Sequence, residues 1–231
     1  MWSKFEATGR FAVVEALRSK RNAVLLLRDK HRRPLVFKAV EDGAEEIGIL
    51  RHLAEHGVAV PAVLEEVEPP PGVRGFFLEY VVGEPLCDYL EQQEKLGVPV
   101  LQLLPVMKAW VQWLQTFYAS MAHPEQRRLQ DVNLRNFLWE PIRGRFTGVD
   151  FEHCPPGFVE DDLGGIAAFL LTYDPVFTPW KLQLTRLFLQ LASEMLAVDD
   201  TMVRRAAEEQ LRILSLRREQ KFPVETLQEI I

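Results

Sequence analysis

The first third of the chain contains short apolar segments with the composition of β-strands. Residues 11–17 (FAVVEAL) and 23–27 (AVLLL) are rich in β-branched and aliphatic side chains, and the polar segment RSKRN separates them. This pattern predicts a β-hairpin. A second turn, at DKHRRP, leads into the apolar segment 35–40 (LVFKAV), which contains Lys38. We therefore expect a third strand that carries a lysine in its interior.

A helix and two more apolar segments follow. Residues 44–56 have apolar side chains at helical spacing, and Gly57 is a typical helix stop. The segments VAVPAVLEEV and GFFLEYVV, with the loop PPPG between them, have the composition of strands. Residues 1–82 are therefore predicted to form a five-stranded sheet with one helix.

The pattern changes to helices after Gly83. Helices are expected at residues 101–122, 162–172, 176–197 and 200–217, and two short strands at residues 137–140 and 146–151. A β-rich region followed by a helical region is a permitted order in α+β proteins. The sequence therefore predicts an α+β fold with two lobes, an N-lobe of residues 1–82 and a mostly helical C-lobe of residues 83–231.

The overall composition limits the classes of function. The chain has 231 residues, of which 48% are hydrophobic and 26% charged, as is typical of a globular protein. Its formal net charge of −6 argues against nucleic acid as a partner, because phosphate binding needs a basic surface. The segment Arg18–Arg33 is an exception, with seven Lys and Arg side chains against one Asp. This segment is either a solvated hairpin face or a surface that meets an anionic substrate or a membrane.

The cysteines and the apolar stretches bear on location. Cys87 and Cys154 form no CxxC motif, and the segment MWSKFEATGR does not have the pattern of a signal peptide. The longest uncharged apolar stretch, Gly164–Tyr173, has about half the length that a membrane span needs. We therefore expect a cytoplasmic protein without a transmembrane segment, and a peripheral membrane contact stays open.

The residues with the clearest chemistry lie between positions 129 and 153. Asp131 and Asn136 are five residues apart in LQDVNLRNFLW, and Asp150 follows the next strand pair in GVDFEH. Phosphoryl transfer needs a carboxylate that orients or deprotonates the attacking hydroxyl group, and it needs oxygen ligands for Mg²⁺. Asp131 can meet the first need, and Asn136 with Asp150 can meet the second.

The order D-x-x-x-x-N, strand hairpin, D-F resembles the catalytic and metal-binding loops of the protein-kinase superfamily. The resemblance implies ATP and Mg²⁺ as cofactors, with Mn²⁺ as an alternative metal. It implies that Asp131 is the catalytic carboxylate and that Asn136 and Asp150 are metal ligands. It also implies a lysine in the third strand that contacts the ATP phosphates and pairs with a glutamate of the next helix. Lys38 and Glu46 stand at those positions.

Further parts of the nucleotide site follow from the same resemblance. The segment LEYV resembles the hinge of the superfamily, where main-chain atoms of Glu79 and Val81 would bind adenine. The first hairpin turn has no glycine, so backbone N–H groups cannot approach phosphates as they do in a glycine-rich loop. The side chains of Ser19, Lys20 and Asn22 would contact the phosphates instead.

Within the superfamily, the details point away from ordinary protein kinases. Asn133 stands where serine/threonine protein kinases have a lysine. The loop DVNLRN is similar to that of the lipopolysaccharide core (Kdo/heptose) kinases, and aminoglycoside phosphotransferases and the Bud32/RIO atypical kinases follow in similarity. The resemblance implies an ATP-dependent phosphotransferase acting on a hydroxyl acceptor, such as a sugar, a glycan or another small molecule. An atypical serine/threonine protein kinase is the alternative.

The sequence also departs from the superfamily pattern. Leu129 stands where a histidine is usual, and Glu152 replaces the glycine of D-F-G. Asp162, at the start of the next helix, is expected to hold the 131–136 loop from below. These departures and the glycine-free turn leave a catalytically inactive, nucleotide-binding scaffold as a further alternative.

A different motif favours a rival class. The segment His52–His56 matches H-x-x-E-H, the pattern of inverted zinc proteases. Two histidines four residues apart lie on the same face of a helix, as metal ligands must. The sequence shows no third ligand segment, and the structural interpretation is that both histidines lie in the last helical turn, near the negative end of the helix dipole. A zinc hydrolase is therefore kept as a rival to the phosphotransferase.

Overall fold

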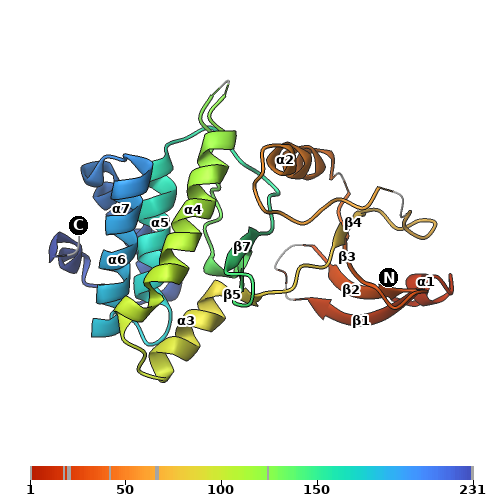
Figure 1. Cartoon of the computed structure of the whole chain (residues 1–231), viewed down its shortest axis with the longest axis horizontal. Helices are drawn as coiled ribbons and strands as arrows, with labels where there is room; N and C mark the ends of the chain where they lie inside the picture. The colour runs from red at the N-terminus through yellow and green to blue at the C-terminus, as the bar shows by residue number, and fades with distance from the viewer. Residues whose placement is uncertain are drawn as a thin grey trace. The chain divides into compact units, whose positions relative to one another are not determined.

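The computed structural model describes residues 2–17, 19, 22–41, 43–65, 68–123 and 125–229, and the chain divides into two compact units. The first unit contains Met1–Val82 together with the short segment Asp150–Glu152. The second unit contains Gly83–Val149 and His153–Ile231 (Figure 1). In the described part of the chain, no helix is long and apolar enough to cross a membrane.

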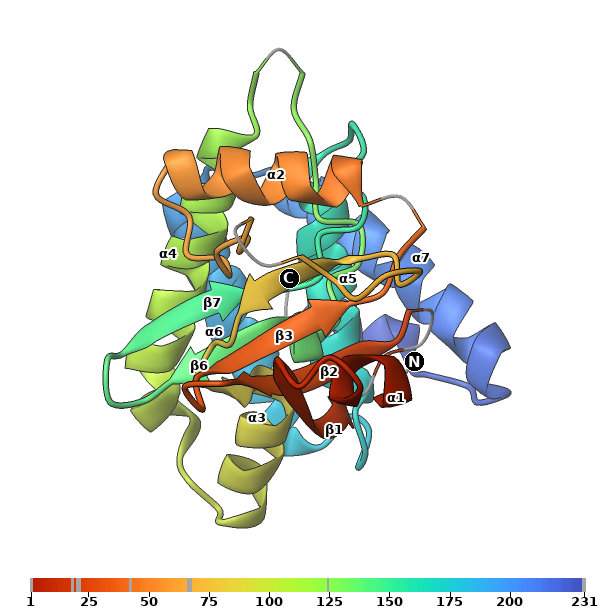
Figure 2. The ribbon, with the colours of Figure 1, turned by 90° about the vertical axis from the view of Figure 1, so that its right-hand side faces the viewer.

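An antiparallel sheet forms the frame of the first unit. Within the described residues it has four strands in the order β1-β2-β3-β4. These strands are β1 (Phe11–Leu17), β2 (Val24–Asp29), β3 (Pro34–Lys38) and β4 (Phe76–Glu79). The helix α2 (Ala44–Glu55) lies beside the sheet (Figure 2). The predicted hairpin, the third strand with Lys38 and the helix after it are therefore all present.

The core of the first unit is aromatic, and a short N-terminal helix completes it. The helix α1 (Trp2–Glu6) buries Phe5 completely, and the Phe5 ring lies 4.8 Å from that of Phe37 and 5.9 Å from that of Phe11 between centroids. Phe77 of β4 joins the same cluster. The sequence pattern did not predict α1, because five residues are too few to show a helical period.

The predicted fifth strand is absent as a strand. The segment VAVPAVLEEV makes only an isolated bridge between Val63 and Leu78 in its described part, and Glu66 and Val67 lie outside the described residues. The two hydrogen bonds of this bridge, from the Leu64 N–H to the Phe77 carbonyl at 2.9 Å and from the Glu79 N–H to the Ala62 carbonyl at 2.8 Å, are the backbone pairing that this segment makes with β4 among the described residues. Within the described residues, the sheet therefore has four strands, and the prediction of five was wrong by one.

The second unit is mostly helical. Its elements are β5 (Glu84–Pro85), α3 (Leu86–Lys95), η1 (Val100–Leu103), α4 (Leu104–Ser120), η2 (Leu134–Asn136), β6 (Phe137–Glu140), β7 (Arg145–Gly148), α5 (Val159–Thr172), α6 (Pro179–Leu196), α7 (Asp200–Arg218) and η3 (Val224–Glu229). The helices α4, α5, α6 and α7 pack side by side (Figure 1). The predicted helices of this region are present, although residues 101–103 belong to the 3₁₀ turn η1 and α6 begins at Pro179 rather than at residue 176. The predicted strand at residues 146–151 ends at Gly148, so Asp150 lies after the strand.

Two contacts show how tightly these helices pack. Trp110 of α4 is fully buried, and its ring centroid lies 5.2 Å from that of Phe137 and 5.0 Å from that of Phe188. In α5, a Cβ atom at Gly164 would lie 2.5 Å from the Cβ of Ala206 in α7. The backbones of α5 and α7 can approach this closely only because residue 164 has no side chain.

Candidate functional site

Lys38 is the centre of a polar cluster in the first unit. It is the last residue of β3, it is 5% exposed, and its Nζ lies 2.9 Å from the carboxylate of Glu46 in α2. The same Nζ lies 2.6 Å from Oδ1 of Asp150 and 3.0 Å from Oε1 of Glu152. We call these four residues the lysine cluster. The cluster unites Lys38, Glu46 and Asp150, which the sequence assigned to one nucleotide site.

The charges of the lysine cluster do not balance. Burial alone would lower the pKa of Lys38, but the carboxylates of Glu46 and Asp150 raise the pKa of this ammonium group to about 12. Lys38 therefore stays protonated, and one positive charge faces three carboxylates. Asp150 is the outermost of the three, with 45% of its side chain exposed. Asp150 is therefore the carboxylate of the lysine cluster that is most open to solvent.

Asp150 also has an uncommon backbone conformation. Its φ angle is 70°, in the left-handed region that a non-glycine residue enters rarely, although Asp does so more readily than most. Gln130, directly before Asp131, has a φ angle of 63°. Left-handed conformations at non-glycine residues are concentrated at functional sites. A left-handed residue therefore occurs in both segments that carry candidate site residues, at Asp150 itself and at Gln130 beside Asp131.

The glycine-free turn meets the lysine cluster through Asn22. The Asn22 Nδ2 donates a hydrogen bond of 2.6 Å to Oε1 of Glu152. Ser19 is exposed, whereas Lys20, the third side chain predicted to contact phosphates, lies outside the described residues. So do Arg18 and Arg21 of the basic segment. Glu152 was not assigned to the site from the sequence, although its position two residues after Asp150 is the signal that could have indicated it.

In the second unit, Asp131 and Asn136 belong to one hydrogen-bonded loop. Asp131 is exposed, and its Oδ1 accepts a hydrogen bond from the Asn133 N–H at 3.2 Å. The Asn136 Nδ2 donates to the Asp131 carbonyl at 3.2 Å. This orientation leaves the side-chain oxygen of Asn136 without a partner among the described residues. The Asn136 carbonyl accepts from Val149 at 2.8 Å, and Val149 directly precedes Asp150.

Asp162 holds the start of this loop, as the sequence analysis expected. It lies in α5, and its side-chain oxygens accept from the N–H groups of Leu129 at 2.6 Å and Gln130 at 3.1 Å. The Tyr118 hydroxyl group donates to the same carboxylate at 3.0 Å. Burial raises the pKa of Asp162 to about 6, against the lowering effect of these hydrogen bonds and of Arg128. The Leu129 backbone is thus fixed without a histidine side chain.

Two further contacts fix the middle of the loop, and sequence reasoning did not find them. Asn133 Oδ1 accepts from the Arg135 N–H at 3.1 Å and from the Tyr173 hydroxyl group at 2.9 Å. The Arg135 guanidinium donates to both carboxylate oxygens of Asp88 in α3, at 3.2 and 3.0 Å. Asp88 and Tyr173 are far from the loop in sequence, so no local pattern indicated them.

The predicted hinge residues are only partly available. Glu79 is the last residue of β4, and its N–H donates to the Ala62 carbonyl at 2.8 Å. Its carbonyl oxygen is therefore the main-chain atom that can meet a base. Val81 is half-buried and follows the strand.

The two histidines at the end of α2 contact each other rather than a group of ligands. Their ring centroids are 4.2 Å apart, and Nδ1 of His56 lies 2.8 Å from the carbonyl oxygen of His52. Among the described residues, no group of three or more His, Cys, Asp and Glu side chains is arranged to hold a metal ion. The zinc hydrolase interpretation therefore lacks a third ligand in this part of the chain.

Comparisons with known proteins identify the fold. No protein-family model matches the sequence, and no curated protein matches it. Among solved structures, the amicoumacin kinase hAmiN, in complex with AMP-PNP, Ca²⁺ and Ami, is similar with a TM-score of 0.62 at 14% identity, over 85% of this chain and 77% of that one. WaaP in complex with acyl carrier protein is similar with a TM-score of 0.59 at 16% identity, over 90% and 91%.

A third similar structure is the kinase PK-1 of Cydia pomonella granulovirus, with a TM-score of 0.51 at 16% identity, over 65% of this chain and 57% of that one. The chain therefore has a protein-kinase-like fold of the α+β class, as its residue pattern predicted. Identities of this size establish the fold alone.

Proposed function

We propose that this chain is an ATP-dependent phosphotransferase that transfers a phosphoryl group to a hydroxyl acceptor. The observation that carries the proposal is the lysine cluster, in which a buried ammonium group is held by Glu46 and contacts Asp150. Phosphoryl transfer depends on positioned charges around the nucleotide phosphates, and a lysine fixed by a glutamate supplies one of them. Kinases with the same fold support this class of activity.

The residues present suit a divalent metal ion. The lysine cluster has surplus negative charge, Asp150 is its exposed carboxylate, and the side-chain oxygen of Asn136 has no partner among the described residues. Hard cations such as Mg²⁺ and Mn²⁺ prefer carboxylate and amide oxygens. We assign Asp150 and Asn136 as the metal ligands. When bound, Mg²⁺ would neutralise charge on the nucleotide phosphates.

Asp131 is proposed as the residue that acts on the acceptor. Its carboxylate is exposed, and only one of its oxygens accepts a described hydrogen bond. In the transfer, the acceptor hydroxyl oxygen forms a bond to the γ-phosphorus, and the bond between that phosphorus and the β,γ-bridging oxygen breaks. ADP leaves with the electron pair of that bond, and the hydroxyl proton passes to the Asp131 carboxylate.

The nucleotide site is assigned to residues of the first unit. Lys38, positioned by Glu46, would bind the phosphates, with Ser19 and Asn22 of the glycine-free turn as further contacts. The carbonyl of Glu79 and the main chain of Val81 would meet adenine. Glu152 competes with phosphate oxygens for Lys38, so nucleotide binding must displace this carboxylate.

For the acceptor, we favour a sugar or another small hydroxylated molecule. The name of one similar structure, an amicoumacin kinase, supports a small molecule rather than a protein, and the likeness of the loop DVNLRN to that of the lipopolysaccharide core kinases supports a sugar or glycan. An atypical serine/threonine protein kinase, with a protein hydroxyl group as acceptor, is the alternative.

A catalytically inactive scaffold is the second candidate function, and Glu152 favours it. This carboxylate accepts from Asn22 and contacts Lys38, so it occupies the polar atoms that a phosphate would need. If the contact persists when a nucleotide binds, Lys38 cannot position the phosphates, and the chain would bind nucleotide without transferring a phosphoryl group.

The test combines nucleotide binding with phosphoryl transfer. ATP with Mg²⁺ should raise the melting temperature, because a ligand at a hundredfold excess over its Kd stabilises a protein by about 2.7 kcal/mol. Label from γ-labelled ATP should then appear on a hydroxyl compound in a metabolite panel. Absence of a shift with any nucleotide, with Mg²⁺ or Mn²⁺, would disprove the proposal. A shift without any transfer, including transfer to the chain itself, would favour the scaffold.

A further inference from the structure

A cavity lies within the second unit, beside the loop that carries Asp131. Its volume is about 220 Å³, and its walls come from α3, η2, the end of α5 and the start of α6. Leu134 and Arg135 of the 131–136 loop are part of the wall. Pockets for drug-sized ligands measure roughly 300–1,000 Å³, so this cavity suits a smaller, ring-sized molecule.

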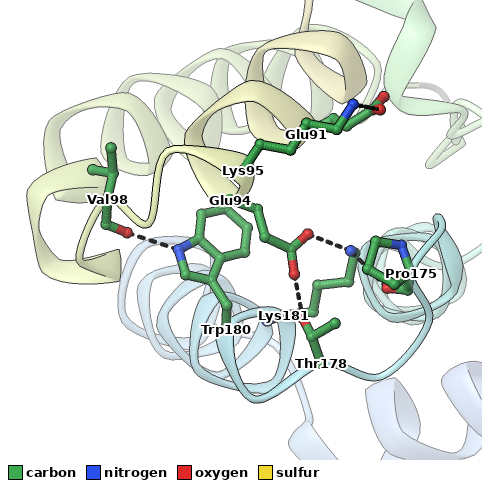
Figure 3. Close-up of polar contacts among 8 residues, drawn as sticks. All are labelled: Glu91, Glu94, Lys95, Val98, Pro175, Thr178, Trp180 and Lys181. Carbon is green, nitrogen blue, oxygen red and sulfur yellow. Dashed lines mark hydrogen bonds and ion pairs between the residues drawn. The ribbon is translucent and has the colours of Figure 1, made fainter.

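The wall has an apolar base and aromatic sides. Leu90, Leu170 and Leu184 form apolar surface, each from a different helix. Trp180 and Tyr173 add aromatic rings. The Trp180 Nε1 donates a hydrogen bond of 2.7 Å to the Val98 carbonyl, which fixes the orientation of the indole (Figure 3). Apolar and aromatic surface of this kind packs against the C–H faces of a saturated ring.

The two cationic side chains of the wall are already neutralised. Lys181 is 5% exposed, and it forms an ion pair with Glu94 and donates to the Pro175 carbonyl at 2.7 Å (Figure 3). Glu94 also accepts from the Thr178 hydroxyl group. Arg135 is held by both oxygens of Asp88. Neither cation is therefore free to bind an anionic ligand without losing a partner.

Negative charge remains at the rim of the cavity. Asp174 is exposed, lines the cavity, and has no hydrogen bond or ion pair among the described residues. Glu91 also lines the cavity, and its one ion pair, with Lys95 at 2.5 Å, is half exposed and contributes little. The rim therefore attracts a positively charged group and disfavours a phosphate or carboxylate.

We propose that this cavity binds a ring-sized, hydroxylated molecule that carries a protonated amine, as an amino sugar does. The leucines and Trp180 contact the ring, and the carboxylates of Asp174 and Glu91 bind the ammonium group and accept hydrogen bonds from hydroxyl groups. Calling this ligand the phosphate acceptor rests on the function proposed above and on the place of Arg135 in the Asp131–Asn136 loop. The proposal that the cavity binds this ligand does not depend on that function.

The experiment uses three probes of nearly equal shape and different charge. Glucosamine, glucose and glucuronate carry one positive, no and one negative charge at neutral pH. Ligand-detected NMR titrations of the full chain, without nucleotide, give the three affinities. We expect glucosamine to bind about two- to fivefold more tightly than glucose, the range that one exposed charge pair supports, and glucuronate to bind most weakly.

Variants test whether the carboxylates at the rim cause the preference for glucosamine over glucose. Asp174→Asn should remove most of the glucosamine preference and leave glucose binding unchanged, because only a charge is lost at an exposed position. Glu91→Gln should reduce the preference in part. Glu209→Gln, on the exposed face of α7 and outside the cavity wall, is the matched control and should leave the affinity ratio unchanged. Higher salt should reduce the preference in the wild type.

Three results would overturn the inference: binding of none of the probes at millimolar concentrations, glucuronate binding as tightly as glucosamine, or an unchanged ratio in Asp174→Asn. The thermal shift with ATP is measured on the same samples. Sugar binding without a nucleotide shift supports the cavity and removes the phosphotransferase. A nucleotide shift without sugar binding removes the cavity proposal and leaves the phosphotransferase standing.

Discussion

Lys38 illustrates how one side chain can have more partners than its charge can balance. Three carboxylates surround it, and two of them, Asp150 and Glu152, come from a segment more than a hundred residues later in the chain. A buried ammonium group paired with a single carboxylate would have no net charge. The proposed metal site at Asp150 and the proposed acceptor role of Asp131 give these two aspartates different roles, which substitution can separate.

The first prediction compares two of these aspartates. Asp131→Asn removes the carboxylate proposed to act on the acceptor but leaves the lysine cluster intact. Nucleotide affinity should stay near the wild-type value, while turnover should fall by about 10²–10⁴, the range for a positioned acid–base group. Asp150→Asn should lose both Mg²⁺-dependent binding and turnover. Nucleotide titration and label transfer measure the two effects, and full activity of Asp131→Asn would contradict the assignment.

The second prediction concerns pH and Asp162. Its pKa is about 6 in the folded chain against an ordinary value of 3.8, so the folded state takes up a proton at higher pH than the unfolded state. The stability that this protonation contributes is present below about pH 4 and is lost as the pH rises through about 6. Relative to Asp162→Asn, the wild type should therefore lose stability across this range and change little above it.

Urea denaturation between pH 4 and pH 7 measures this difference. Tyr118→Phe is the control, because it keeps the ionisable carboxyl group. It removes a hydrogen bond that lowers the Asp162 pKa, so the pH dependence should remain and move to higher pH. A stability difference between wild type and Asp162→Asn that does not change with pH would show that burial does not raise this pKa.

At the scale of elements, the spacing of apolar residues correctly predicted several helices and strands, because these elements depend mainly on local sequence. The hairpin of β1 and β2, the strand with Lys38, and the helices α5, α6 and α7 all followed from apolar spacing. The fifth strand was predicted wrongly because a β-like composition indicates an extended segment but does not show how many of its residues pair with a neighbour, and here the described pairing is one bridge. The helix α1 was not predicted, because Phe5 in the aromatic core stabilises it and its own length does not.

The candidate site was predictable to a similar extent. Motif order indicated Lys38, Glu46 and Asp150, and the structure places these three side chains in contact. The Arg135–Asp88 pair and the Tyr173–Asn133 hydrogen bond could not be predicted, because they depend on which helix ends meet the loop. Contacts of this kind are set by tertiary packing, and a single sequence contains no periodic signal for them.

The third prediction tests helix packing with two glycines. Gly164→Ala in α5 would place a Cβ atom 2.5 Å from a backbone nitrogen and a Cβ of α7, so we expect a loss of about 1–3 kcal/mol in the free energy of unfolding. Gly48→Ala in α2 meets nothing within 4 Å and should stabilise by about 0.5–1 kcal/mol. Chemical denaturation of both variants gives the signs, and an unchanged Gly164→Ala would contradict the close α5–α7 contact.

At the scale of the whole molecule, negative charges outnumber positive charges. The net charge of −6 includes the acidic surplus of the lysine cluster and the carboxylates at the rim of the cavity. The cluster suits a metal ion, and the rim suits an amine. Both candidate sites are therefore proposed to prefer cationic ligands over anionic ones.

The division of the chain into two units limits how the chain can be divided into fragments. Asp150–Glu152 belongs to the first unit, although the residues on both sides of it belong to the second. A fragment that ends at Val82 would keep Lys38 and Glu46 as a neutral pair and would lose the two carboxylates that make the cluster anionic. No single break in the chain can therefore separate the two units and leave each of them complete.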